Sequence, residues 1–302
     1  MTKSLRLRQL LARNQATLLC GAYDGLSARL AAEAGFDAIW ASGFCIAASK
    51  ALPDVGLVTM SEHLSRTAEM VRSVDAPVVV DADDGFGDFV NLTRTVREYE
   101  AAGVAALCVE DNQHPKRCSL YADLDRKIVS AEEFADKIKA AKDAQISDDF
   151  VFVARTEALV AGRPMSEAID RGHLYEEAGA DVLLVHWTQP GSQAIEEFAA
   201  KWTGNIPLAV VPTAIPQASA SFLTEHGYRM VVFANQALRS AIETMQLSMR
   251  RMVETGSLLS VDDMICTLRE VARLVDLDEV RALEKRYAKT GAKPELSVIE
   301  AS

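Results

Sequence analysis

The sequence predicts an α/β protein of the (β/α)8 TIM barrel class with extra C-terminal helices. Three observations support this prediction: a 302-residue chain accommodates one such barrel, eight apolar runs alternate with amphipathic stretches, and four helix-to-strand junctions share one pattern. An open doubly wound sheet is the alternative, although it usually has fewer strands. We therefore expect a catalytic barrel over residues 1–240 and a helical tail over residues 241–302.

The four junctions each combine an Ala- and Glu-rich helix end, a glycine and an apolar run that starts two or three residues later. The glycines are Gly35, Gly103, Gly179 and Gly227. Glycine readily adopts the left-handed conformation that often ends a helix, and a continuous apolar run is typical of a strand buried on both faces. Each junction therefore predicts a helix end followed by a buried strand.

Four further apolar runs complete the predicted set of eight strands, and they lie at 17–23, 76–83, 150–156 and 206–213. The intervening segments SEHLSRTAEMVRSV and SAEEFADKIKAAKDAQ have the spacing of apolar residues that is typical of helices packed on a sheet. No linker rich in Pro, Gly or Ser divides the chain.

Beyond the eighth predicted strand, the segment SAIETMQLSMRRMVETG and the stretches 261–274 and 277–288 are expected to be helical. Eight strands with their own helices leave these segments little barrel surface to cover. We therefore expect some of the tail helices to pack on the barrel or on a neighbouring subunit.

The composition excludes several classes of protein. The chain has 43 acidic and 32 basic residues and a formal net charge of −11, which argues against a nucleic-acid partner but not against a small anionic substrate. Its five cysteines include no CxxC pair, which favours a reducing compartment. No signal peptide and no apolar run of membrane-spanning length is evident, so we expect a cytoplasmic protein without a membrane partner.

Reactive side chains in a (β/α)8 barrel gather where the strands end. Asp81 and Asp83 end the third apolar run and point to the same side, and Glu110 ends the fourth run. Three converging carboxylates favour Mg²⁺, whose remaining positions a 2-oxo acid could fill, so that the ion would stabilise an enolate. The alternative is that these residues only form polar turns.

Further polar residues follow the later strands. Arg155 ends the fifth run and His186 the sixth, and together they would form a cationic wall suited to a phosphonate or a second carboxylate. A structural ion pair between Arg155 and Glu157 is the alternative. Thr213 and Asn235 follow the seventh and eighth runs. The remaining predicted packing or surface histidines are His63, His173 and His226.

The longest polar connection, NQHPKRCSLYADLDRKIVSAEEF, follows Glu110 and Asp111 and is predicted to act as a lid. Its active part would be Lys116, Arg117, Cys118 and Ser119. A thiol beside two cations should have a lowered pKa and could serve as acid or base, but a loop cysteine without a role is equally common. Of the other cysteines, Cys20, Cys45 and Cys108 are expected in or near the core and Cys266 on a tail helix.

Over almost its whole length, the sequence resembles the phosphoenolpyruvate mutase and isocitrate lyase superfamily, and within it the phosphoenolpyruvate mutase and phosphonopyruvate hydrolase branch. The resemblance rests on GAYDGLSARLAAEAGFDAIWASGF, the PD pair at 53–54, VVVDADDGFGD, REYEAAGVAALCVED, DFVFVARTEALVAG, EEAGADVLLVH, VPT and FANQALR. It implies a magnesium-dependent enzyme of phosphonate metabolism that acts on a 2-oxo acid.

The resemblance also implies roles for individual residues. The Mg²⁺ ligands would be Asp81, Asp83 and Glu110. The residues that bind the 2-oxo acid would be Trp40, Ser42, Gly43 and Phe44, with Asp54 in the same polar floor. Those that face a phosphonyl group would be Ser119, Arg155 and His186. Arg155 and His186, with Lys116 and Cys118 of the lid, are the candidate catalytic residues. The family is typically a homotetramer with swapped tail helices.

The lid departs from the family pattern. Mutases have E-D-K, five residues and then N-S, and the hydrolase has Thr in place of that Asn, whereas this chain has Glu110-Asp111-Asn112, five residues and then Cys118-Ser119. Lyases have K-K/R-C-G-H with a catalytic Cys, and this chain matches only the first three positions, at 116–118. His186 and Thr213 favour the phosphonate branch, because the lyases normally have Glu where His186 stands.

Three functions therefore remain open. The first is isomerase or hydrolase chemistry at the carbon–phosphorus bond of phosphonopyruvate. The second is a lyase that cleaves a carbon–carbon bond in a substituted malate, an isocitrate-like or an oxaloacetate-like acid, with Cys118 as the acid. The third is a non-catalytic barrel that only binds a ligand. The sequence leaves the exact substrate and the direction of the reaction undecided.

Overall fold

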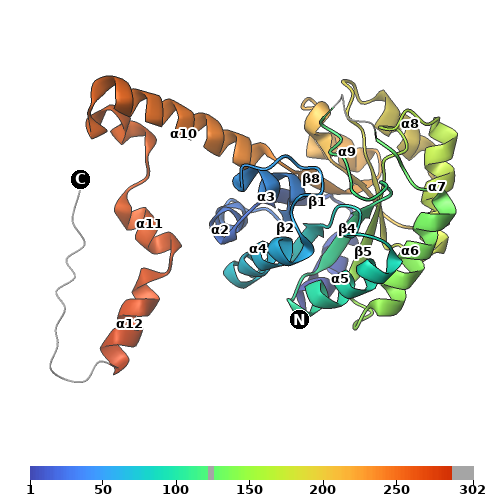
Figure 1. The fold of residues 1–302 in the computed structure, drawn as a ribbon, viewed down its shortest axis with the longest axis horizontal. Coiled ribbons are helices and arrows are strands. Elements are labelled where there is room, and N and C mark those ends of the chain that lie inside the picture. Colours follow the sequence, from blue (N-terminus) through green and yellow to red (C-terminus); the bar gives the residue numbers. More distant parts are fainter. Residues whose placement is uncertain (122–125, 288–302) are drawn as a thin grey trace. The chain divides into compact units, whose positions relative to one another are not determined.

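The protein folds around a closed barrel of eight parallel strands, paired in sequence order (Figure 1). The computed structural model describes residues 1–121 and 126–287. Strand β1 pairs with β2 on one side and with β8 on the other, so the sheet closes on itself. The (β/α)8 prediction is confirmed, and the open sheet is excluded.

All eight strands lie within the predicted apolar runs. Their bounds are β1 Thr17–Ala22, β2 Ala38–Ala41, β3 Val78–Asp81, β4 Ala106–Glu110, β5 Val151–Thr156, β6 Val182–Val185, β7 Leu208–Val210 and β8 Tyr228–Phe233. The four junction glycines have φ of +93°, +83°, +104° and +90° in chain order, which confirms the left-handed helix ends.

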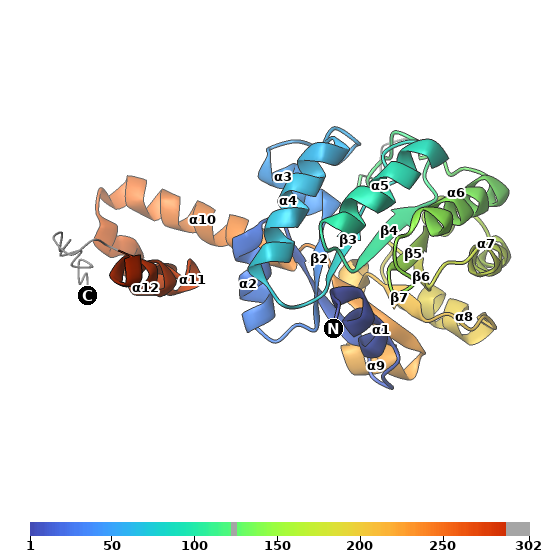
Figure 2. The same ribbon diagram turned by 90° about the horizontal axis from the view of Figure 1, so that it is seen from below.

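Helices surround the barrel in both views (Figures 1 and 2). Their bounds are α1 Lys3–Leu11, α2 Gly25–Glu33, α3 Gly43–Ser49, α4 Met60–Ser73, α5 Phe89–Ala101, α6 Ala131–Ala144, α7 Met165–Glu177, α8 Gln193–Lys201 and α9 Ala220–Glu225. A short 3₁₀ helix, η1, covers Pro212–Ala214. The side chains of Asp24 and Thr59 cap the first turns of α2 and α4, which explains where these helices begin.

The core has an inner and an outer part, because the side chains of a barrel strand alternate between the two faces of the sheet. Leu19, Trp40, Val79 and Cys108 belong to the inner cluster, while the outer cluster lies between the strands and the surrounding helices. Helix α1, which the sequence did not predict, contributes Leu7 and Leu11 to the inner cluster and so buries apolar side chains against the strands. Cys20, Cys45 and Cys108 are buried, as expected, whereas the placement of Cys266 on a tail helix is wrong, because this exposed residue lies between η2 and α11.

The chain divides into two compact units after Leu238. The second unit contains most of α10 (Gln236–Thr255), η2 (Leu258–Met264), α11 (Leu268–Leu274) and α12 (Leu277–Tyr287). The predicted helix over 261–274 is wrong, because η2 ends at Met264 and the Thr267 hydroxyl accepts a hydrogen bond from the Glu270 N–H to start a new helix. The predicted helix at 277–288 is confirmed to Tyr287, and its last residue lies outside the described residues.

Candidate active site

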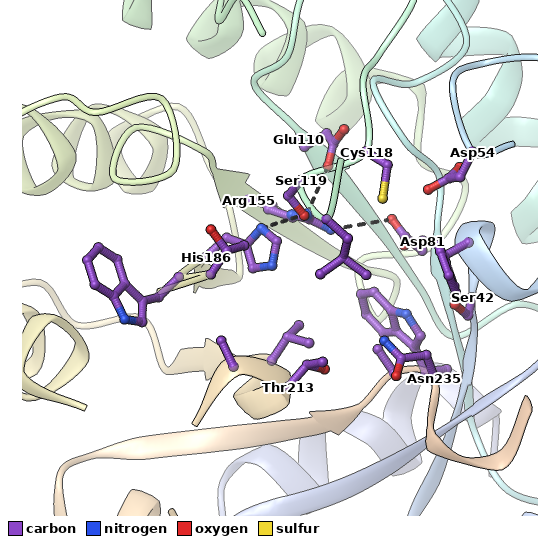
Figure 3. Close-up of a pocket in the computed structure, with 18 of the residues that line it drawn as sticks. Ser42, Asp54, Asp81, Glu110, Cys118, Ser119, Arg155, His186, Thr213 and Asn235 are labelled. Carbon is purple, nitrogen blue, oxygen red and sulfur yellow. Dashed lines mark hydrogen bonds and ion pairs between the residues drawn. The ribbon is translucent and has the colours of Figure 1, made fainter. Parts of the chain in front are cut away.

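The carboxyl ends of the strands surround a small cavity of about 60 Å³ (Figure 3). All but two of the residues predicted for the site line it. These lining residues are Trp40, Ser42, Phe44, Asp54, Asp81, Glu110, Lys116, Cys118, Ser119, Arg155 and His186. The two exceptions, Gly43 and Asp83, lie directly behind this lining. The structure thus brings together side chains that are up to 146 positions apart in the sequence.

Ser42 and Gly43 connect β2 to α3 at one edge of the cavity. The Ser42 hydroxyl caps α3 by accepting a hydrogen bond from the Cys45 N–H at 3.3 Å. Gly43 packs so closely on Asp83 that a Cβ atom would lie 2.8 Å from Asp83 Oδ1. Only glycine therefore allows this turn to approach the acidic strand ends, and the N–H groups of the first helical turn have no partner within the helix.

The three acidic residues predicted as metal ligands do not converge on one point. Asp81 and Glu110 line the cavity, whereas Asp83 has a left-handed φ of 52° and its Oδ1 lies 2.7 Å from Lys116 Nζ. No group of three His, Cys, Asp or Glu side chains within residues 1–121 and 126–287 is arranged to hold a metal ion. Asp83 is paired with the Lys116 ammonium in this structure, and the assignment of Asp81, Asp83 and Glu110 as Mg²⁺ ligands stays a prediction.

Lys116 forms a double ion pair with the acidic floor of the site. Its ammonium lies 2.7 Å from Asp54 and 2.7 Å from Asp83, and the residue is only 4% exposed. Burial alone would lower the pKa of Lys116, but the surrounding carboxylates outweigh burial and hold the pKa well above its ordinary value. Lys116 is therefore charged at neutral pH.

Asp81 and Glu110 fit a hard divalent cation. Burial raises the pKa of Glu110 to about 7 despite the opposing field of Arg155, so its carboxylate lacks full charge compensation from the protein. Arg155 lies 3.2 Å from Glu110 and 3.9 Å from Asp81. Mg²⁺ commonly takes one or two carboxylates and completes its octahedron with water and substrate oxygens. The two carboxylates that face the cavity have the chemistry of such a site.

Arg155 and His186 form a wall beside these carboxylates. The ion pair of Arg155 with Glu157 is confirmed, and the role of Arg155 toward a phosphonate stays a prediction. Its Nε lies 2.6 Å from Glu157 Oε1, and its Nη2 lies 2.8 Å from His186 Nδ1 (Figure 3). His186 Nδ1 also lies 2.7 Å from Glu157 Oε1. Burial, followed by the Arg155 charge, lowers the pKa of His186. The wall therefore has one cation and one neutral imidazole, rather than the two cations that were predicted.

A buried network behind the wall holds Glu157 in place. Asp111 accepts hydrogen bonds from the Glu157 N–H at 2.8 Å, from Thr156 Oγ1 at 3.1 Å and from the Tyr175 hydroxyl at 2.7 Å, and it forms an ion pair with Arg171 at 3.2 Å. No role was predicted for Asp111, although its position directly after Glu110 was a signal. Its side chain fixes the end of β5 and hence the base of the wall.

The lid segment is anchored at its start by a buried acid. Asp84 Oδ2 accepts a hydrogen bond from the Lys116 N–H at 3.0 Å and lies 2.8 Å from His114 Nδ1. Further along, Arg126 Nη2 donates to the Cys118 carbonyl at 2.8 Å. Arg117 points away from the cavity and donates to backbone carbonyls, including that of Pro115 at 3.0 Å. Lys116 and Cys118 are therefore held over the cavity from both sides.

The predicted lowering of the Cys118 pKa is wrong. The thiol is buried, and burial together with the Asp54 charge raises its pKa to about 12, which outweighs the opposing effect of Lys116. The two flanking cations did not act as expected because one is paired to Asp54 and Asp83 and the other points outward. Cys118 is therefore a neutral thiol at physiological pH.

Comparison with known proteins decides the family. The family model for phosphoenolpyruvate phosphomutase matches residues 7–253. The chain belongs to the phosphoenolpyruvate phosphomutase family. It is 40% identical over 292 residues to the phosphonopyruvate hydrolase of Variovorax sp. (strain Pal2), which covers 96% of this chain and 100% of that protein.

Two solved structures of the same superfamily share the fold. The phosphoenolpyruvate phosphomutase from Streptomyces platensis subsp. rosaceus has a TM-score of 0.93 and 40% identity, and the match covers 95% of this chain and 99% of that chain. A phosphonopyruvate hydrolase complex with oxalate and Mg²⁺ has a TM-score of 0.91 and 38% identity, covering 96% and 100%. The chain is thus an enzyme of this superfamily, and the non-catalytic barrel is set aside.

Some lining residues of this family member carried no predicted role. They are Leu120, Trp187, Thr188, Val211, Thr213, Ala214, Ala234 and Asn235. Most of these residues are apolar, and the others follow the ends of strands, so their residue types gave no sign of a function. Thr213 and Asn235 were recognisable only by their position after β7 and β8.

No helix in the described part of the chain is both long and apolar enough to cross a membrane.

The histidines that were expected to pack do so: His63 is buried and its Nδ1 lies 2.9 Å from the Tyr99 hydroxyl, His173 stacks on Trp202, and His226 lies against Phe222.

Proposed function

We propose that this enzyme requires Mg²⁺ and acts on phosphonopyruvate, whose carbon–phosphorus bond it breaks or rearranges. The observation that carries the proposal is the buried Arg155–His186 wall, which adjoins Asp81 and Glu110 in the lining of one small cavity. A guanidinium suits the oxygens of a phosphonyl group, and the carboxylates suit a metal ion that chelates a 2-oxo acid. A cavity of about 60 Å³ favours a three-carbon substrate over a tricarboxylic acid.

Asp81 and Glu110 would hold the ion, with Asp83 behind them as a charged support for Lys116. When bound, the ion would supply positive charge that stabilises a pyruvate enolate. The related phosphonopyruvate hydrolase was solved with oxalate and Mg²⁺, and oxalate has the shape and charge of such an enolate. The family resemblance and the position of Asp81 and Glu110 in the lining of the cavity together support this assignment.

The protein's own residues would orient the two ends of the substrate. The Ser42 hydroxyl and the N–H groups of Gly43 and Phe44 would bind the carboxylate and 2-oxo oxygens beside Trp40. Arg155, with Ser119 and the neutral imidazole of His186, would bind the phosphonyl oxygens. Breaking the carbon–phosphorus bond leaves its electron pair on carbon as the enolate, while the phosphoryl group passes to the enolate oxygen or to water.

Lys116 would close the site around this reaction. Its ion pairs with Asp54 and Asp83 hold the segment 116–120 over the cavity, where Cys118, Ser119 and Leu120 line the wall. A closed site keeps bulk water from the enolate and leaves a charged ammonium near the substrate. Transfer of the phosphoryl group to the enolate oxygen would make the enzyme a mutase, and transfer to water would make it a hydrolase.

The test is phosphorus NMR of the purified enzyme with Mg²⁺ and phosphonopyruvate. The phosphonate signal should decrease while phosphoenolpyruvate or inorganic phosphate appears, and chelation of the metal should stop the change. An unchanged spectrum in the presence of Mg²⁺ would contradict the proposal. The product that appears identifies the reaction as isomerase or hydrolase.

The second candidate is a carbon–carbon lyase, which one observation favours: the protonated Cys118 thiol lines the cavity and could donate a proton to a leaving enolate. Under our proposal the variant Cys118→Ser retains turnover of phosphonopyruvate within about threefold, because a hydroxyl of similar size only lines the wall. Proton NMR with substituted malates and oxaloacetate tests the lyase directly. Loss of all activity in this variant, with malate cleavage by the wild type, would favour the lyase.

We further propose that the enzyme is a cytoplasmic homotetramer with swapped tail helices. Large apolar side chains are exposed along the second unit, among them Met249, Val253, Leu258, Leu259 and Leu268. Apolar surface of this extent is usually covered by another protein surface. Light scattering of the full chain would give the oligomeric state.

A further inference from the structure

Two polar groups on the wall of the cavity have no partner in the protein. Thr213 Oγ1 and Asn235 Oδ1 are buried side-chain atoms without a hydrogen bond in the described structure, and both residues line the cavity. Asn235 as a whole is only 5% exposed. Leaving such groups unpaired costs free energy, so buried polar atoms in native proteins almost always have a partner. A ligand in the cavity is the partner that this wall lacks.

The position of Asn235 is built into the barrel rather than left to a loose loop. A Cβ atom on Gly21 of β1 would lie 1.9 Å from the Ala234 carbonyl oxygen, so only glycine lets the end of β8 come this close. From the other side, the Cys45 thiol of α3 donates to the same carbonyl at 3.4 Å. The backbone just before Asn235 is therefore fixed between β1 and α3.

The order of strands around the barrel places the two groups at neighbouring strand ends, each next to a different part of the site. Asn235 follows β8, which pairs with β1, and β1 pairs with β2, whose end carries Ser42. Thr213 follows β7, which pairs with β6, whose end precedes His186. Figure 3 shows Asn235 on the side of Ser42 and Thr213 on the side of His186.

The chemistry of this wall differs from that of the remaining lining. Asp54, Asp81, Glu110, Lys116 and Arg155 supply charges on the β2–β5 side. Thr213 and Asn235 are neutral, and each can donate a hydrogen bond, because a hydroxyl rotates and the amide of Asn offers an N–H₂ group as well as a carbonyl. Neutral donors form hydrogen bonds with anionic oxygens without changing the net charge of the site. They can therefore recognise where those oxygens lie.

We propose that Asn235 and Thr213 bind opposite ends of the substrate. Asn235 donates to the carboxylate of the 2-oxo acid through its Nδ2 group, together with Ser42, once its amide turns to exchange the positions of Nδ2 and the unpaired Oδ1. Thr213 donates to the group at the far end, which is the phosphonyl group if the proposed function is correct. Asn235 thus recognises what any 2-oxo acid ligand of this site shares, and Thr213 recognises the part that distinguishes one substrate from another. This inference deepens the proposed function and rests on it only for the identity of the far group.

Oxalate and phosphonopyruvate together separate the two roles, because oxalate lacks the far group. Titration calorimetry with Mg²⁺ and oxalate on Asn235→Ala should show affinity reduced about 10- to 100-fold, the range for a lost hydrogen bond to a charged group. Thr213→Val, which keeps the shape and removes the hydroxyl, should bind oxalate within about twofold of wild type but raise the KM for phosphonopyruvate about tenfold. Exposed Asn205→Ala and half-buried Thr93→Val on α5, neither of which lines the cavity, are the matched controls and should change neither quantity.

Two results would overturn the proposal: oxalate affinity of Asn235→Ala within about twofold of wild type, or equal effects of both variants on oxalate. If Asn235→Ala unfolds below the assay temperature, Asn235→Ser keeps a small polar group and should lose oxalate affinity by a smaller factor that is still above that of Thr213→Val. The oxalate measurements do not require turnover. If the wild type fails to convert phosphonopyruvate but oxalate binding still depends on Asn235, the proposed reaction is wrong and the carboxylate site stands.

Discussion

The two sides of the cavity differ in how their polar groups are satisfied. On the β2–β5 side the charges pair with one another: Lys116 with Asp54 and Asp83, and Arg155 with Glu110 and Glu157. On the β7–β8 side, Thr213 and Asn235 have free polar atoms. The charged side is therefore held mostly by ion pairs within the protein, whereas the neutral side offers polar atoms that a ligand would pair. Substitutions on the charged side should thus alter both stability and turnover, and those on the neutral side should alter recognition.

The largest effect is expected for Asp81→Asn, which removes the carboxylate that faces the cavity on β3. Turnover of phosphonopyruvate should fall about 10³-fold, because charge stabilisation of the enolate is the main contribution to the rate. Phosphorus NMR measures the rate, and calorimetry with oxalate should show a weaker response to Mg²⁺. The exposed Asp143→Asn on α6 is the control and should have wild-type turnover. Full activity of Asp81→Asn would exclude this metal site.

Lys116→Met should have the next largest effect. It leaves Asp54 and Asp83 buried without their cation, which should destabilise the folded protein by about 3–5 kcal/mol and free the segment above the cavity. A misplaced lid should lower kcat about 100-fold. Urea unfolding and steady-state kinetics test the two effects. The exposed pair on α6 offers Lys139→Met as a control, and equal stability of both variants would show that the buried ion pairs contribute nothing.

Glu157→Gln tests the support of the wall, where a turnover loss of about tenfold is expected from a displaced Arg155. Burial alone would raise the pKa of Glu157, but Arg155 and His186 outweigh burial and hold the pKa below its usual 4.5. The carboxylate therefore adds stability that is present above about pH 4.5 and is lost as the pH falls. Unfolding free energies of wild type and variant should differ most at neutral pH, and the difference should shrink progressively as the pH falls below 4.5 toward the lowered folded-state pKa. A difference that does not depend on pH would refute the ionic role.

The smallest effect on turnover is expected for Tyr175→Phe, far behind the wall. Asp111 loses one of several hydrogen-bond donors, so the protein should be less stable by about 1.5 kcal/mol while kcat stays within twofold. Chemical denaturation and kinetics measure both quantities. A large drop in kcat here would show that the buried network controls the geometry of Arg155 more directly than its remaining bonds suggest.

The barrel could be predicted from the sequence because its evidence is local and repeated. Gly35 and its three counterparts mark helix ends by a backbone conformation that other residues rarely adopt, and each is followed by a fully buried strand. The tail was less predictable: its apolar residues are exposed in one chain, so their spacing could not show that Thr267 starts a new helix. Helix α1 was missed because only two of its side chains, Leu7 and Leu11, are buried.

The site was predictable in membership but not in electrostatics. Strand ends bring Asp81, Glu110 and Arg155 together in any (β/α)8 barrel, so their proximity followed from the fold. The pairing of Lys116 with Asp83 depends on a left-handed backbone at Asp83 and on a loop anchored by Asp84, neither of which spacing reveals. The predicted pKa of Cys118 was wrong for the same reason. Lys116 is its neighbour in sequence, but in the folded protein the charge of Lys116 is already paired with Asp54 and Asp83.

The close contact between Gly21 and the Ala234 carbonyl makes residue 21 a diagnostic position when other sequences are compared. A relative with any side chain there must hold β1 and β8 further apart, because the carbonyl oxygen would otherwise lie only 1.9 Å from the added Cβ atom. The residue equivalent to Asn235 would then be carried outward from the cavity. A single position on the first strand thus allows one to sort homologues by how they recognise a carboxylate, without solving their structures.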